Sequence, residues 1–129
     1  MHSLRIGIDL VEVSKVERVF GNRKALQEEV FTQAEIRYSM RQRRPLVHLA
    51  ERFAIKEALF KALGTGLNGE VDWRDVELQK GTSGKASLGL WGETAQVARN
   101  QGLIGYSFSF SHTDEYAVAL VLLVISGPS

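Results

Sequence analysis

The sequence predicts an α+β fold in which a mainly antiparallel sheet packs against one long central helix. The expected elements follow one another as strand, helices, hairpin, helix and hairpin, an order typical of α+β proteins. The longest helical pattern, over residues 46–63, lies in the middle of this order. A chain of 129 residues without a linker, an internal repeat or a low-complexity segment is expected to form one domain, residues 1–129.

Composition excludes several classes of protein. The chain has no cysteine, so it offers no disulfide framework, no thiolate metal site and no cysteine nucleophile. Charged residues interrupt the only apolar run near the N-terminus, so no signal peptide is expected. The longest apolar stretch, residues 117–125, has nine residues, whereas a membrane-spanning helix needs about 20. We therefore expect a cytoplasmic protein that does not enter a membrane.

Alternating apolar residues predict a buried strand over residues 4–11. One face of this strand carries Ile6, Ile8 and Leu10, which we expect in the core. The other face carries Arg5, Gly7 and Asp9. Asp9 is therefore expected near the end of a strand.

Two capping boxes mark the helices that follow. Ser14 with Glu17 predicts the start of a first short helix, and Thr32 with Glu35 predicts the start of a second one. The second helix is expected to end near residue 43, because Pro45 closes it and allows the long helix to begin.

The long helix carries an acid on a face that should be apolar. At about 100° per residue, one sector of this helix holds Leu46, Leu49, Ala50, Phe53 and Phe60. Glu57 projects into the same sector, and burying an unpaired carboxylate costs several kcal/mol. One solution is an ion pair with Lys61, worth roughly 0.2–0.5 kcal/mol. The others are protonation of the carboxylate and a bound metal ion.

The second half of the chain is expected to supply two hairpins and a helix. The predicted strands cover residues 76–80, 85–88, 104–111 and 116–125, and the helix covers residues 90–101. Phe108, Phe110 and His112 alternate onto one face, so His112 is expected at the rim of an apolar surface. A histidine there is either a hydrogen-bonded structural residue or a ligand contact.

The acids favour a hard metal ion over zinc. The three histidines have no zinc-ligand spacing. Asp9 and Glu57 come from separate elements, and Mg²⁺ usually takes one or two carboxylates and completes its shell with water and substrate phosphates. With such an ion bound, Lys56 and Lys61 are expected to flank it and to neutralise the remaining phosphate charge. A phosphate-bearing ligand is therefore plausible on chemistry alone.

Several segments in order carry a family resemblance. They are Gly7-Ile8-Asp9-Leu10-Val11-Glu12, Phe31-Thr32-x-x-Glu35, Arg52-Phe53-Ala54-x-Lys56-Glu57-Ala58 with Lys61-Ala62, Gly64-Thr65-Gly66, Ser109-x-Ser111-His112 and Ala117-x-Ala119. Together they resemble the short holo-acyl-carrier-protein synthases, which are 4′-phosphopantetheinyl transferases. The matched positions run from residue 7 to residue 119, and one such unit fills the chain.

The resemblance implies a Mg²⁺-dependent transfer of 4′-phosphopantetheine from coenzyme A to a serine of an apo-acyl carrier protein, with release of 3′,5′-ADP. Asp9 and Glu57 would hold the metal, Lys61 would assist the departing oxygen, and Glu35 would help, through water, to remove the serine proton. The residues implied for coenzyme A are Arg52, Lys56, Lys61, Gly64, Thr65, Gly66, Ser111 and His112. The carrier would serve fatty acid or polyketide synthesis.

The resemblance also implies partners. An acidic acyl carrier protein would dock on the first helix, at Lys15, Val16, Arg18 and Phe20. Independently, residues 13–44 hold eight Lys or Arg against four Asp or Glu, a bias that can steer an acidic partner. The family implies a homotrimer with sites at the subunit borders.

Two other classes of function stay open at this point. One is a binding module that holds a carrier or a nucleotide without transferring anything. The other is a basic nucleic-acid binder, although no nucleic-acid-binding motif accompanies the charge, so no nucleic acid is expected.

Overall fold

The computed structural model describes residues 1–65 and 72–127. Its elements in chain order are β1 (His2–Glu12), α1 (Val13–Phe20), α2 (Lys24–Val30), α3 (Gln33–Met40), α4 (Pro45–Leu63), the 3-10 helix η1 (Trp73–Asp75), β2 (Val76–Lys80), β3 (Ala86–Leu90), α5 (Gly92–Gln101), β4 (Leu103–His112) and β5 (Tyr116–Ser126). None of the helices within these ranges is both long and apolar enough to cross a bilayer.

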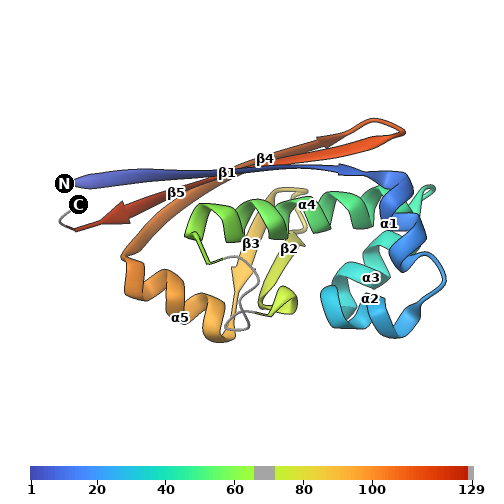
Figure 1. Cartoon of the computed structure of the whole chain (residues 1–129), viewed down its shortest axis with the longest axis horizontal. Helices are drawn as coiled ribbons and strands as arrows, with labels where there is room; N and C mark the ends of the chain where they lie inside the picture. The colour runs from blue at the N-terminus through green and yellow to red at the C-terminus, as the bar shows by residue number, and fades with distance from the viewer. Residues whose placement is uncertain (66–71, 128–129) are drawn as a thin grey trace.

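The strands form two antiparallel sheets. One has the order β1-β5-β4 and the other pairs β2 with β3. Figure 1 shows α4 running beneath the three-stranded sheet, with the β2–β3 hairpin on the other side of the helix. The helices α1 to α3 gather at one end of α4 and α5 lies near the other. The predicted α+β class, with a mainly antiparallel sheet against a long central helix, is confirmed.

Helix α4 begins and ends where its sequence signals predict. Pro45 occupies the first turn, and Gly64 ends the helix with a φ of 76°, in the left-handed region that glycine adopts at low cost. The helix is buried on more sides than the predicted apolar sector, because Ala54, Ile55 and Ala58, which lie outside that sector, are also buried. The sheet and the hairpin cover opposite sides of α4, so the buried surface of the helix is wider than the single apolar stripe that the sequence predicts.

The predicted buried face of β1 is wrong. Ile6, Ile8 and Leu10 are 56–65% exposed, whereas Gly7 is buried against α4. The reason is steric: a Cβ on Gly7 would lie 1.8 Å from the carbonyl oxygen of Ala58. The strand therefore turns the face that carries glycine toward the helix backbone and leaves its large apolar side chains outside.

The start signals of the short helices give mixed results. The Thr32–Glu35 capping box is confirmed, with both reciprocal hydrogen bonds present. The Ser14–Glu17 box is wrong, because β1 runs directly into α1 and Ser14 already lies inside the helix. Helix α2 was not predicted, and α3 ends at Met40, earlier than expected.

Candidate active site

The structure brings three of the predicted residues together where β1 crosses α4. Asp9 extends from the strand, and Glu57 and Lys61 lie one turn apart on the helix. The Lys61 Nζ donates to Asp9 Oδ1 at 2.9 Å and to the Ile8 carbonyl oxygen at 3.1 Å. The ion pair that Lys61 forms is therefore with Asp9 and not with Glu57, which was one of the alternatives for this acid.

Glu57 lies in an electrostatically unfavourable place for a carboxylate. Partial burial raises its pKa, and the negative charge of Asp9 raises it further. The positive charges of Lys61 and Lys15 act in the opposite direction and do not cancel the effect. Two acids close enough to repel each other create a region that favours a divalent cation.

The two carboxylates suit Mg²⁺, which takes some of its ligands from water and substrate, better than they suit a metal ion that needs all its ligands from the protein. Across residues 1–65 and 72–127, no three His, Asp or Glu side chains gather in an arrangement that could hold an ion. Two carboxylates are enough for Mg²⁺, which commonly keeps waters and takes further oxygens from substrate phosphates. Asp9 and Glu57 meet that requirement.

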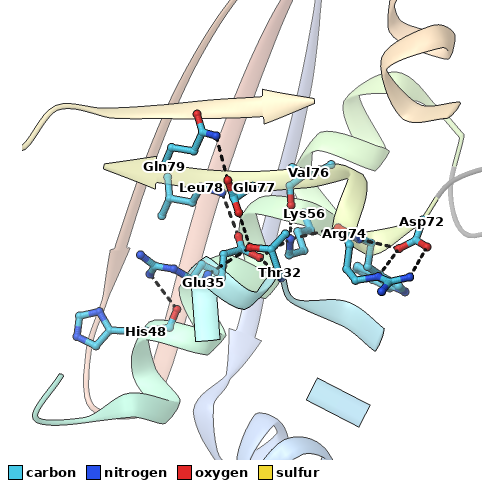
Figure 2. Close-up of polar contacts among 12 residues, drawn as sticks. Thr32, Glu35, His48, Lys56, Asp72, Arg74, Val76, Glu77, Leu78 and Gln79 are labelled. Atoms are coloured by element: carbon cyan, nitrogen blue, oxygen red, sulfur yellow. Dashed lines mark hydrogen bonds and ion pairs between the residues drawn. The ribbon is translucent and has the colours of Figure 1, made fainter. Parts of the chain in front are cut away.

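Lys56 and Glu35 lie elsewhere, inside the protein. Lys56 is fully buried, and its Nζ donates to the Trp73 carbonyl oxygen at 3.1 Å and to the Val76 carbonyl oxygen. It also forms an ion pair with Glu35 Oε1 at 2.8 Å, at the centre of the contacts in Figure 2. Burial lowers the pKa of Lys56, although the charge of Glu35 raises it. The expectation that Lys56 flanks the metal is not met.

Glu35 is equally enclosed. Its side chain is 1% exposed and accepts hydrogen bonds from the Thr32 backbone N–H at 3.1 Å and the Leu78 backbone N–H at 3.0 Å. With Lys56 these contacts join α3, α4 and β2 (Figure 2). A carboxylate so enclosed does not reach solvent to take a proton from an attacking serine, so this conformation contradicts the expected role of Glu35.

Arg52 is also buried, at 2% exposure. Its guanidinium donates to the His48 carbonyl oxygen at 3.2 Å and lies 4.4 Å from the centre of the Tyr38 ring. Burial lowers the pKa of Arg52, while Glu35 and Tyr38 raise it. Arg52 thus belongs to the α3 side of α4, about 140° around the helix from Glu57 at 100° per residue.

The remaining coenzyme A candidates lie at element ends. Gly64 and Thr65 follow α4, and the Thr65 hydroxyl oxygen is buried without a hydrogen-bond partner among the described residues. Gly66 lies outside the described residues. Ser111 and His112 end β4, where His112 Nδ1 lies 2.8 Å from Glu51 Oε2. Sequence reasoning missed Glu51, because these partners are 61 residues apart.

The predicted docking helix is only partly a surface. Lys15 and Arg18 are exposed on α1, as expected. Val16 and Phe20 are 2% and 5% exposed, and the Phe20 ring packs against Phe31 with centroids 5.3 Å apart. These two apolar residues belong to the core, so the prediction that they form part of the docking surface is wrong.

The fold and the site define an α+β protein with two converging acids and a lysine suited to a divalent cation and a phosphate. The chain belongs to the 4′-phosphopantetheinyl transferase superfamily, whose sequence model matches residues 5–121. The family expected from the motifs is thereby confirmed, and with it the expectation of an enzyme.

Individual relatives agree. The chain is 40% identical to a holo-[acyl-carrier-protein] synthase of Moorella thermoacetica over 93% of both chains. Its structure is similar to the ACPS–CoA complex of Chronobacterium ammoniagenes, with a TM-score of 0.83, 28% identity and coverage of 97% and 99%. It is also similar to a Bacillus anthracis holo-(acyl-carrier-protein) synthase in complex with CoA (3′,5′-ADP), with a TM-score of 0.75, 32% identity and coverage of 95% and 96%.

Proposed function

We propose that this protein transfers 4′-phosphopantetheine from coenzyme A to a serine of an apo-acyl carrier protein and releases 3′,5′-ADP. The observation that carries the proposal is the junction of Asp9, Glu57 and Lys61. Relatives of the same family are named holo-[acyl-carrier-protein] synthases, and solved structures similar to this one hold coenzyme A.

The reaction forms one bond and breaks one. The serine Oγ of the carrier bonds to the phosphorus next to the pantetheine arm, and the bond from that phosphorus to the bridging oxygen breaks. The bridging oxygen leaves on 3′,5′-ADP, and the serine proton passes to water. Asp9 and Glu57 hold Mg²⁺ in this proposal, and bound Mg²⁺ neutralises the pyrophosphate oxygens. The Lys61 ammonium, 54% exposed, is free to exchange Asp9 for a phosphate oxygen and to stabilise the departing charge.

The buried residues take a supporting part. Lys56, Glu35 and Arg52 face the interior around α4, so their charges do not contact the pyrophosphate in this conformation. Gly64 and Thr65 remain proposed contacts of the nucleotide, and Ser111 and His112 remain proposed contacts of the adenosine phosphate end of coenzyme A. The His112 side chain is partly exposed, and the Glu51 carboxylate holds it in place.

The exposed face of the sheet supports a homo-oligomer, which we propose to be a trimer. Leu4, Ile6, Ile8 and Leu10 of β1 pair with Val124, Leu122, Leu120 and Val118 of β5, so all eight share one face. A contiguous apolar face of this kind marks a protein interface. Assembly over this face would place the site of one subunit beside its neighbour.

The acidic carrier is proposed to dock beside the site. Lys15 and Arg18 are exposed on α1, and the charge of Lys15 already acts on Glu57. A carrier held by these cations would therefore present its serine close to the two acids. Lysine and arginine on an exposed helix affect association more than they affect stability.

The test is a mass measurement. Incubation with apo-carrier, coenzyme A and Mg²⁺ is expected to add the mass of phosphopantetheine to the carrier, and chelation of the metal is expected to stop the gain. Glu57→Gln is expected to abolish the gain, because it removes charge and keeps shape, while the exposed Glu93→Gln on α5 is expected to behave as wild type. Absence of any gain with several apo-carriers would refute the proposed reaction. Full activity of Glu57→Gln would refute the metal assignment.

A further inference from the structure

Glu51 is a buried carboxylate that the proposed chemistry does not use. It lies on α4, and its side chain is 6% exposed. One carboxylate oxygen lies 2.8 Å from His112 Nδ1 and the other lies 3.6 Å from His48 Nδ1. Glu51 thus links the central helix to the last residue of β4.

The contact fixes the orientation of the His112 ring. Because Nδ1 faces the buried carboxylate, the opposite edge of the imidazole carries Nε2, and the side chain is 41% exposed. No residue in the described ranges forms a hydrogen bond with Nε2. A carboxylate behind a histidine sets which nitrogen is presented to a ligand, as in metal sites and catalytic sites.

His48 does not compete strongly for the charge of Glu51. Burial lowers the pKa of His48, as do the positive charges of Arg52 and His112, while Glu51 raises it. The longer distance of 3.6 Å also marks the weaker contact. Glu51 is therefore chiefly a partner for His112.

We propose that Glu51 is a positioning residue that holds His112 Nε2 toward the 3′-phosphate of coenzyme A and thereby sets the preference for coenzyme A over 3′-dephospho-coenzyme A. This inference rests on the proposed function, in which His112 contacts the adenosine phosphate end. It adds a residue and a substrate feature: the buried acid acts through the histidine and does not touch the phosphate.

The test compares the two substrates in four variants. Glu51→Ala is expected to raise KM for coenzyme A roughly tenfold, the effect of one weakened charge-assisted hydrogen bond, with kcat unchanged. KM for 3′-dephospho-coenzyme A is expected to stay at the wild-type value. Glu51→Gln, which still accepts from Nδ1, is expected to show a smaller change. In a His112→Ala background, Glu51→Ala is expected to have no further effect.

Each contrary result has a definite meaning. Equal increases of KM for both substrates, or a loss of kcat, would overturn the inference and leave Glu51 as a structural residue. An unchanged substrate preference in His112→Ala would also overturn it, although the transferase activity itself would stand. Loss of the proposed function would appear differently, as no mass gain on the carrier with wild-type enzyme. Should Glu51→Ala fail to fold, Glu51→Gln and His112→Ala carry the same comparison.

Discussion

Replacing Lys56 by methionine tests whether this lysine is an interior support or a phosphate contact. The variant keeps the length of the side chain and removes its charge, so Glu35 is left buried at 1% exposure with two backbone N–H donors and without its ion-pair partner. Breaking a buried ion pair from one side costs about 3–5 kcal/mol. The carbonyl oxygens of Trp73 and Val76 also lose their shared donor.

This cost is large against the whole stability of a domain, which is about 5–15 kcal/mol. For a chain of 129 residues it corresponds to a fall in Tm of roughly 10–18 °C. The matched control is Lys85→Met, which removes an exposed lysine from the turn between β2 and β3 and is expected to change Tm little. Calorimetry measures the change in Tm, and urea unfolding measures the change in the free energy of unfolding.

The double variant Lys56→Met with Glu35→Gln decides between the two roles. If the pair is an interior support, removing both charges recovers about 2 kcal/mol or more relative to the sum of the single changes, and KM for coenzyme A recovers with the fold. Additive losses of stability would refute the coupling. A stable Lys56→Met variant that has lost coenzyme A binding, with no rescue in the double variant, would show that Lys56 reaches the ligand.

Five further outcomes are expected. Gly7→Ala should lower stability by about 3 kcal/mol or more, at or above the upper end for overpacking, because the added methyl meets helix backbone that has little room to move; a near-wild-type urea midpoint would contradict this packing. Glu57→Gln should raise the Tm of the metal-free protein at neutral pH: a carboxyl with a raised folded pKa costs stability above that pKa, and the gain should disappear as pH falls and wild-type Glu57 protonates. For the same reason, Mg²⁺ affinity measured by calorimetry should weaken on acidification at a higher pH than an ordinary glutamate would give. Lys15→Glu with Arg18→Glu should raise KM for the carrier far more than KM for coenzyme A, and equal increases would exclude docking on α1. Ile8→Lys on the exposed sheet face should reduce the assembled mass in sedimentation, and an unchanged mass would exclude this face as the subunit interface.

Much of the site follows from local sequence signals. The long helix and its ends are readable because proline and glycine act within one turn. Asp9, Glu57 and Lys61 are readable as a group because Asp9 lies late in a predicted strand and the other two residues are spaced by one helical turn. The structure places these three together.

The sequence does not reveal which side of each element meets the core. Alternation shows that β1 has two faces, but it does not show which face meets the core. The close approach of Gly7 to the α4 backbone makes the glycine face the inner one. Lys56 and Glu57 are neighbours in the chain but lie 100° apart around the helix axis. With protein on several sides of α4, one goes to the interior pair with Glu35 and the other to the site.

By itself, then, the sequence determined the order of the five strands, the central helix, the family motifs and the acids near the crossing of β1 and α4. The tertiary structure alone decided that Ile6, Ile8 and Leu10 face outward, that Glu35 and Lys56 support each other in the interior, and that Glu51 holds His112. The physical reason is the distance along the chain over which each interaction acts. Helix periods and caps are set by residues within about four positions, whereas burial and ion pairing depend on which distant segment arrives against a given face.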